Sequence, residues 1–350
     1  MSWEDNVRKV IPYIPGEQPQ TKNLIKLNTN ECPYPPSPKV EKILGEMKYE
    51  DFRLYPDPNA SELVDAISSY YNVPGDQIFV GVGSDDVLSM AFMTFFNSDK
   101  PVLFPDITYS FYDVWAKLYN IPYKVCPLNE NLRIVTGDYY TNNGGIVLPN
   151  PNAPTGVLED VIAIEDIIAH NRDVVVIIDE AYIDFGGKSV LPLIDKYDNL
   201  LVVQTFSKSR AMAGMRIGFA FGSKKLIKYL SDAKFSFNSY TMNIPSIKLG
   251  TASISDDEYF KSTCRKIMET RRRTKCELKA LGFSFPDSQA NFIFAKHENI
   301  SGQSLFCALK AAGIYVRHWN APRIEDYLRI SIGTDDQMDK LIAFLKDYLK

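Results

Sequence analysis

Histidine and cysteine are scarce in this 350-residue sequence, which contains three histidines and five cysteines. The histidines show no HxxxH spacing, and no CxxC pair occurs among the cysteines. We therefore expect no metal, and the sequence supports neither a zinc knuckle nor a disulfide framework. The scattered and odd number of cysteines is typical of a reducing compartment, so we expect a cytoplasmic protein.

Long apolar runs and a strong net charge are also absent. No apolar stretch approaches the roughly 18 residues that a membrane-spanning helix needs, and the N-terminal segment lacks the continuous apolar core of a signal peptide. The net charge of −4 does not favour general affinity for nucleic acid or anionic lipid. We interpret the basic run Arg271, Arg272 and Arg273 as the solvated face of a helix.

Short apolar runs rich in β-branched residues recur through the first two thirds of the chain. Such runs are typical of strands buried on both faces, and hence of a largely parallel sheet covered by helices. The last two runs are separated by a loop too short for a helical crossover, so we expect these strands to be antiparallel. An α/β domain over residues 45–250 is therefore predicted. Its seven strands are expected at residues 77–83, 101–105, 123–128, 145–150, 174–182, 200–206 and 217–222, with helices at 84–96 and 109–120.

The two ends of the chain differ from this pattern. A long helix expected over 259–283 is followed by alternating short strands and helices, which predicts a small α+β domain over residues 251–350. The first 44 residues hold several prolines, including Pro12, Pro15 and Pro38. They favour an extended N-terminal arm rather than a helix. In the small domain, strands are expected at 291–296, 314–319 and 327–333, and helices near 302–312 and from 335 onward.

Polar motifs follow four of the predicted strands. In a parallel α/β sheet, ligands bind beyond the carboxyl ends of the strands. The motifs there would bring together a candidate phosphate cradle, an amide, a carboxylate, a phenol and an amine. They are GSDD (83–86), NPNAPTG (150–156), DEAY (179–182) and SK (207–208).

Each motif alone has a plain structural explanation, but three residues favour a ligand. Ser84 is a good N-cap, and the helix that it begins offers free N–H groups to a phosphate. Asp179 ends an apolar strand, where a carboxylate without a cation is costly. Lys208 lies near Arg210 and Arg216, whose charges lower the pKa of a lysine and make its amine a usable nucleophile.

The segment TFSKSRAMAGMRIGF (205–219), together with DEAY, NPNAPTG and GSDD in this order, resembles the lysine segment and site motifs of fold-type I pyridoxal-phosphate aminotransferases. Within that family the chain is most similar to the histidinol-phosphate aminotransferases. The similarity covers the whole chain, through PYIPGEQ (12–18), KLNTNECPYPPSP (26–38), RLYPDP (53–58), YVRHW (315–319) and YLRISIGT (327–334).

The resemblance implies the architecture and the reaction. It implies a large domain with a seven-stranded, mostly parallel sheet, a smaller α+β domain and an extended arm. The cofactor would be pyridoxal 5'-phosphate. The reaction would be transamination of L-histidinol phosphate with 2-oxoglutarate to imidazole acetol phosphate and L-glutamate, in histidine biosynthesis.

The resemblance also implies roles around the cofactor ring. Lys208 matches the lysine that binds the cofactor aldehyde and moves a proton at the substrate carbon. Asp179 matches the carboxylate that pairs with the pyridine nitrogen. Tyr182 and Asn152 match groups that hydrogen-bond to the ring hydroxyl, although Ala153 stands where many aminotransferases have asparagine.

Other cofactor contacts follow in the same way. Tyr109 resembles the aromatic residue that stacks on the ring. The two acidic side chains after Ser84 are expected to point away, because only the backbone of a helix N-terminus needs to approach a phosphate. The groups expected to bind the cofactor phosphate are the backbone of Ser84 and Asp85, the hydroxyls of Thr205 and Ser207, and Arg216.

Substrate and partner contacts complete the implied site. Arg329 matches the arginine that binds an anionic group of the substrate, with Arg317 rather than Arg323 expected to help it. Asn30 and Glu31 are expected to line the imidazole end. Tyr55 is similar to a residue that reaches the phosphate of the neighbouring subunit's cofactor, and Tyr13 to one that contacts the partner's substrate. The resemblance therefore implies a homodimer with shared sites.

Other functions remain as alternatives. The same cofactor could serve an aromatic amino acid aminotransferase or a threonine-phosphate decarboxylase-like enzyme, and only a decarboxylase would release CO₂ without a keto acid. A non-catalytic regulatory domain is disfavoured by the complete lysine, aspartate and arginine set. A dehydrogenase is disfavoured because Asp86 occupies the third glycine position of the dinucleotide fingerprint.

Overall fold

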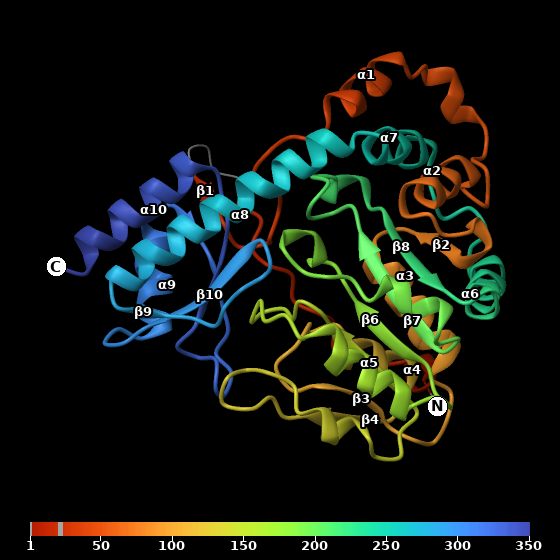
Figure 1. Cartoon of the computed structure of the whole chain (residues 1–350), viewed down its shortest axis with the longest axis horizontal. Helices are drawn as coiled ribbons and strands as arrows, with labels where there is room; N and C mark the ends of the chain where they lie inside the picture. Colours follow the sequence, from red (N-terminus) through yellow and green to blue (C-terminus); the bar gives the residue numbers. More distant parts are fainter. Residues whose placement is uncertain (1, 20–23) are drawn as a thin grey trace.

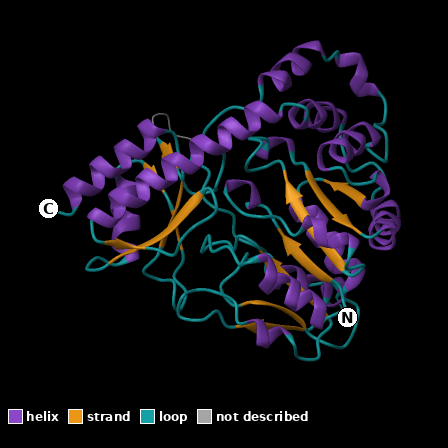
Figure 2. Cartoon of the chain, in the orientation of Figure 1, coloured by secondary structure: helices purple, strands orange, loops and turns teal. Residues whose placement is uncertain are grey.

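The computed structural model describes residues 2–19 and 24–350. The predicted arm, residues 1–44, therefore includes five positions, residue 1 and residues 20–23, that lie outside the described residues. Two regions of sheet are visible in Figure 2, a larger one among helices and a smaller one near the C-terminus. No helix within the described residues is both long enough and apolar enough to cross a bilayer.

A seven-stranded sheet forms the larger region, as predicted. Its strand order is β2-β8-β7-β6-β5-β3-β4. Strand β8 is antiparallel to both β2 and β7, and the remaining pairs are parallel, which confirms the expected antiparallel pairing across the lysine loop. The strands are β2 (Ile78–Gly81), β3 (Val102–Pro105), β4 (Tyr123–Cys126), β5 (Gly145–Pro149), β6 (Val176–Asp179), β7 (Leu200–Thr205) and β8 (Gly218–Gly222).

Helices cover both faces of this sheet (Figure 1). Adjacent residues of one strand face opposite sides: Ile177 packs with the layer of α3, α4 and α6, and Ile178 with the layer of α1, α2, α5 and α7. Burial on both sides explains the continuous apolar runs in the sequence. The helices are α1 (Pro38–Glu46), α2 (Ser61–Tyr71), α3 (Ser84–Phe95), α4 (Tyr112–Tyr119), α5 (Val161–His170), α6 (Lys224–Phe237) and α7 (Ile244–Ile254).

The smaller region is an antiparallel sheet of order β12-β13-β10-β9, beside a parallel pair of β1 and β11. The single strand expected at 314–319 is two strands in different sheets, divided at Val316. Helix α8 is shown in Figure 1 running from the region of α7 to α10. The elements are β1 (Ile25–Lys26), α8 (Asp257–Ala280), β9 (Phe283–Ser284), β10 (Phe292–His297), α9 (Gly302–Ala311), β11 (Ile314–Tyr315), β12 (Arg317–His318), β13 (Leu328–Ser331) and α10 (Asp335–Tyr348).

Part of the predicted arm is helical, contrary to expectation. Pro38 begins α1, and Ser37 accepts a hydrogen bond from Lys39 N (3.1 Å) as its N-cap. A proline at the first helical position costs nothing, because its missing N–H would have no helical partner there. The predicted domain boundaries at 44/45 and 250/251 fall within α1 and α7, and the division into domains stays a prediction. Short 3₁₀ helices lie at Trp3–Asn6, Tyr49–Arg53, Gly75–Gln77, Thr136–Tyr139, Ile183–Phe185, Leu191–Asp195 and Ala213–Met215.

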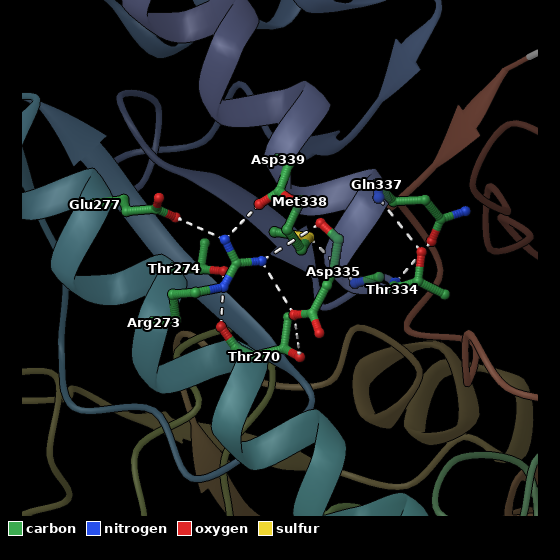
Figure 3. A network of polar contacts seen from close by, with 10 residues as sticks. Thr270, Arg273, Thr274, Glu277, Thr334, Asp335, Gln337, Met338 and Asp339 are labelled. Carbon is green, nitrogen blue, oxygen red and sulfur yellow. Dashed lines mark hydrogen bonds and ion pairs between the residues drawn. The ribbon is translucent and has the colours of Figure 1, made fainter.

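The arginine run on α8 is not a uniformly solvated face, so that interpretation was wrong for two of its members. Arg271 is buried and donates to the carbonyl oxygens of Phe185 (3.0 Å) and Ala290 (2.7 Å). Arg273 pairs with Asp335 (3.0 Å) and Asp339 and joins α8 to α10 (Figure 3). Three consecutive side chains on a helix point in different directions. Arg271 therefore enters the core, Arg273 contacts α10, and Arg272 is exposed to solvent.

Candidate active site

A cavity of about 160 Å³ lies at the carboxyl ends of the strands. It opens into a cleft of about 900 Å³ between the large sheet and the small one. The structure thus brings most of the predicted cofactor residues together. The predicted residues that line the cavity are Glu31, Ser84, Asp85, Tyr109, Asp179, Tyr182, Ser207, Lys208 and Arg216.

Lys208 extends from the loop between β7 and β8 into this cavity. Its Nζ donates to the carbonyl oxygen of Thr29 (3.3 Å) and lies 5.9 Å from the centre of the Tyr182 ring. Arg216 lines the same cavity, but Arg210 does not. The Arg210 guanidinium is buried against Phe260 (4.0 Å to the ring centre), so only one of the two expected cations faces the amine.

Asp179 is a buried carboxylate without a cation partner in the described chain. Its Oδ2 accepts a hydrogen bond from Tyr112 Oη (2.9 Å) and its Oδ1 one from Ala181 N (3.1 Å). Burial raises its pKa to about 6, although these two hydrogen bonds act in the opposite direction. Such a group is stabilised by a cation placed at its remaining lone pairs.

Tyr112 is a functional candidate that the sequence reasoning missed. It is fully buried and orients Asp179 from the first turn of α4. The available signal was its spacing: Tyr112 begins α4 three residues after Tyr109, and the two rings lie 5.7 Å apart. A tyrosine on a predicted helix is otherwise indistinguishable from a core residue.

The beginning of α3 differs from the prediction in two respects. The N-cap residue is Gly83 rather than Ser84, and the Asp85 carboxylate points into the cavity instead of away from it. It accepts from Tyr109 Oη (2.7 Å) and Arg216 Nη2 (3.2 Å), which explains its direction. Gly83 has φ +88°, a backbone conformation that favours glycine, and a Cβ there would lie 2.4 Å from Arg216 Nη2 and displace the guanidinium from this position.

Two predicted cofactor residues lie behind the cavity wall. Asn152 directs its amide nitrogen to the carbonyl oxygen of Ile107 (3.0 Å) and to Thr155 Oγ1 (3.1 Å), and Ala153 lines the cavity in its place. Thr205 Oγ1 lies 3.0 Å from Ser207 Oγ and is buried. Both amide hydrogens of Asn152 have acceptors within the protein, and its contact with the cofactor ring stays a prediction.

Asn30 and Glu31 line different parts of the site, Asn30 the cleft and Glu31 the cavity. Asn30 is buried and donates to Tyr182 Oη (2.9 Å), so it fixes the phenol as well as lining the cleft. Glu31 pairs with Lys26 and lines the cavity beside Lys208. Burial raises the pKa of Glu31, but the hydrogen bond and charge of Lys26 outweigh burial and lower it.

Arg317 and Arg329 form the far wall of the cleft. They are direct partners across the antiparallel pair of β12 and β13. One terminal nitrogen of Arg329 donates to the carbonyl oxygen of Asn28 (2.9 Å), whereas its buried Nε has no hydrogen-bond partner in the described chain. Burial, with the charge of Arg317, lowers the pKa of Arg329. The ion pairs formed among the described residues include neither arginine.

Tyr13 lines the cleft of its own chain, and its contact with a partner's substrate stays a prediction. Its ring packs on Phe111 at a centroid distance of 4.2 Å, and Arg8 holds the arm to the carbonyl oxygen of Leu118. The apolar ring of Phe111 gives the arm a place to bind on α4 of the same chain. Tyr55 is different: it is 81% exposed, stacks on Tyr240 and does not line the cavity.

Arg323 is fully engaged in joining the two sheets. It pairs with Asp106 after β3 (2.7 Å) and donates to the carbonyl oxygens of Leu128 (2.7 Å) and Asn129 (3.2 Å). The expectation that Arg317 rather than Arg323 assists Arg329 stays a prediction, and these contacts support it.

We expect Arg323→Ala to loosen the segment 320–327, with amide exchange there about fivefold faster because an exposed ion pair contributes roughly 1 kcal/mol. Hydrogen exchange with mass spectrometry measures this. Arg133→Ala is the matched control, since Arg133 also binds one carboxylate, with one carbonyl oxygen where Arg323 binds two, at similar exposure but within the large sheet region. Equal exchange at 320–327 in both variants and the parent protein would contradict the prediction.

The fold and the lysine-centred cavity define a class of enzyme. The profile of the family Aminotransferase class I and II matches residues 22–345, and the chain belongs to that family. Among curated relatives, it is 52% identical to the histidinol-phosphate aminotransferase of Lactococcus lactis subsp. cremoris (strain MG1363), over 100% of this chain and 98% of that protein. It is 49% identical to the histidinol-phosphate aminotransferase of Clostridium acetobutylicum, over 99% and 98% of the two chains.

Solved structures share the fold. A histidinol-phosphate aminotransferase from Clostridium acetobutylicum aligns with a TM-score of 0.86 at 24% identity, covering 93% of this chain and 99% of that one. One from Sinorhizobium meliloti, in complex with pyridoxal-5'-phosphate, aligns with a TM-score of 0.85 at 21% identity, covering 93% and 90%. The predicted fold-type I architecture is therefore confirmed.

Proposed function

We propose that the protein is a pyridoxal-phosphate-dependent transaminase of histidine biosynthesis. It transfers the amino group of L-histidinol phosphate to 2-oxoglutarate and yields imidazole acetol phosphate and L-glutamate. The observation that carries the substrate assignment is the arginine pair Arg317 and Arg329. Two cations directly opposite each other repel, and without a carboxylate partner they are best neutralised by a dianion such as a phosphate monoester.

The residues of the cavity fit the cofactor. Lys208 offers an amine, Asp179 a buried anion for a protonated ring nitrogen, and the first turn of α3 with Ser207 and Arg216 a binding place for phosphate. Asp85 carries the opposite charge and pairs with Arg216, so phosphate binding requires this carboxylate to turn away. When bound, pyridoxal phosphate supplies an electron-poor ring that accepts the electron pair left at the substrate carbon.

Side chains of the protein bind and orient the reactants and move protons. Lys208 Nζ would hold the cofactor and, once released, would move a proton from the carbon that carries the substrate amine to the cofactor carbon that receives the amine, and would move one in the opposite direction in the second half-reaction. Asp179 keeps the ring nitrogen protonated, and Tyr112 keeps Asp179 in place. Tyr182, whose hydroxyl accepts a hydrogen bond from Asn30, holds its ring beneath the lysine amine, 5.9 Å from Nζ. Arg329 and Arg317 bind phosphate in one half-reaction and a carboxylate of glutamate in the other.

Tyr112→Phe is expected to weaken cofactor binding in a pH-dependent manner. The Tyr112 hydrogen bond lowers the pKa of Asp179, so its loss raises that pKa above the present value of about 6. More Asp179 is then neutral at pH 6.5 than at pH 8.5. We expect the dissociation constant for pyridoxal phosphate to rise about tenfold at pH 6.5, since a hydrogen bond to a charged group contributes about 1.5 kcal/mol, and to rise less at pH 8.5.

Fluorescence titration of the apoenzyme at the two pH values measures this effect. Tyr139→Phe is the matched control, because Tyr139 is equally buried and its hydroxyl has no hydrogen-bond partner among the described residues. An equal loss of affinity at both pH values, or the same loss in the control, would count against an orienting role for Tyr112.

Substrate profiling tests the proposed reaction. Holoenzyme with 2-oxoglutarate should use histidinol phosphate with a kcat/KM at least about a hundredfold above that for phenylalanine or tyrosine, because their single carboxylate leaves one arginine charge unpaired. The reverse preference would favour an aromatic amino acid aminotransferase. CO₂ release from threonine phosphate without 2-oxoglutarate would favour a decarboxylase.

We also infer a cytoplasmic homodimer with shared sites. Exposed aromatic side chains support the dimer: Tyr55 is 81% exposed and packs on Tyr240, which follows α6, and Phe237 at the end of α6 is 74% exposed. Large apolar side chains exposed on one surface are typical of interaction sites. All five cysteines are free, in keeping with a reducing compartment. Sedimentation should give about twice the chain mass of 39.7 kDa, and a monomeric active enzyme would contradict the shared site.

A further inference from the structure

The indole ring of Trp319 lies beside both anion-binding arginines, Arg317 and Arg329. Trp319 follows Arg317 by two positions, so both side chains emerge on the same side of the extended chain. The guanidinium carbon of Arg317 lies 5.4 Å from the centre of the Trp319 ring, and that of Arg329 lies 5.2 Å from it. Trp319 lines the cleft together with both arginines. No role was assigned to it from the sequence.

This ring compensates for an unfavourable pairing. Arg317 and Arg329 are directly opposite each other on neighbouring strands, where like charges repel. Arg329 is further enclosed by Phe292, 5.4 Å from its guanidinium carbon, and by the backbone of Asn28. Its position is therefore fixed by several contacts. The face of an indole attracts a cation, and tryptophan does so more strongly than the other aromatic residues.

Arg317 depends on Trp319 more than Arg329 does. Besides the ring, its hydrogen-bond partner within the described residues is the carbonyl oxygen of Ile14, at 3.5 Å and in an exposed position. A contact at this distance is at the limit of a hydrogen bond. Without the indole, repulsion from Arg329 and hydration would turn the Arg317 guanidinium toward solvent, and Arg329 alone would remain of the arginine pair in the cleft.

We propose that Trp319 is a positioning residue that determines the preference for a phosphate dianion over a single carboxylate, by holding two guanidinium groups side by side in the cleft. The proposal deepens the proposed function and rests on it. A dianion uses both charges, whereas a monocarboxylate is bound by Arg329 alone. Loss of the ring therefore affects phosphate binding much more than carboxylate binding.

Binding of two small probes to the holoenzyme tests this proposal. Propyl phosphate and butyrate have the same alkyl chain, lack an amino group and differ in the charge of the anionic group. Calorimetric titration gives the ratio of the butyrate to the propyl phosphate dissociation constant. We expect Trp319→Leu to lower this ratio about tenfold, the size of a desolvated cation–π contact, and Trp319→Phe to stay within about threefold of the parent protein.

Trp3→Leu is the control, because Trp3 is 74% exposed and contacts neither arginine. If Trp319→Leu does not fold, Trp319→Gln removes the ring with a polar side chain suited to a partly exposed position. Equal weakening of both probes, or an unchanged ratio, would overturn the proposal, because a merely structural role affects both ligands alike.

The role of Trp319 and the proposed function can be disproved independently. If the parent enzyme turns over histidinol phosphate and the Trp319 variants keep the parent ratio, only the role of Trp319 is wrong. If the parent enzyme neither uses histidinol phosphate nor prefers propyl phosphate, the proposed function itself is wrong.

Discussion

Lys208→Ala should reduce kcat by at least about a thousandfold and remove the visible absorbance band of the holoenzyme. The variant loses the only amine that the described structure directs into the cavity. A positioned proton-transfer group contributes roughly 10²- to 10⁴-fold in rate, and loss of the covalent attachment adds to this. Steady-state kinetics and absorption spectra of the purified variant, reconstituted with pyridoxal phosphate, measure both effects.

Lys296→Ala provides the comparison for this result, since Lys296 is an exposed lysine of β10 that lies outside the cavity. It should keep the parent spectrum and rate. A Lys208→Ala enzyme that retains most of its turnover would contradict the assignment of the catalytic amine.

Arg329→Leu should lower kcat/KM for histidinol phosphate about a thousandfold, mainly through a higher KM. The guanidinium is partly buried, and its buried Nε has no hydrogen-bond partner within the described residues. Loss of two hydrogen bonds to a charged group, each contributing about 2 kcal/mol, gives this magnitude. Arg329→Lys should recover little of the loss, because an ammonium group cannot bind a phosphate with a planar fork.

Arg323→Ala tests whether the cleft binds substrate through its overall positive charge or through the position of the arginine pair. Arg323 also lines the cleft, but its guanidinium is occupied by Asp106 and two carbonyl oxygens. We expect less than about a fivefold change in kcat/KM, the effect of an exposed ion pair. Similar losses in Arg323→Ala and Arg329→Leu would show that the cleft acts through its overall charge rather than through the arginine pair.

The sheet could be predicted well because burial on both faces leaves a strong pattern. Each of the seven strands coincides with an apolar run, and the short lysine loop determines the direction of β8. The convergence of Ser84, Asp179 and Lys208 follows from the same rule, since strand ends of one sheet meet along one edge. Here local sequence contains the information that decides the structure.

Side-chain directions could not be predicted in the same way, because they depend on partners distant in the sequence. Asp85 turns inward toward Arg216, 131 positions away in the chain, and Tyr112 reaches Asp179 across 67 positions. Arg271 is drawn into the core by carbonyl oxygens of two other segments. Trp319 gains its role only when β12 and β13 are in register. Neither the composition nor the spacing of motifs in the sequence indicates that these residues come into contact.

Borohydride reduction of the holoenzyme, followed by proteolysis and mass spectrometry, tests the central claim most directly. Reduction makes the bond between the cofactor and its lysine permanent, so the modified residue can be located in the sequence. We predict one pyridoxyl group per chain, on Lys208. A label on another lysine, or a chain that carries no label, would contradict the account.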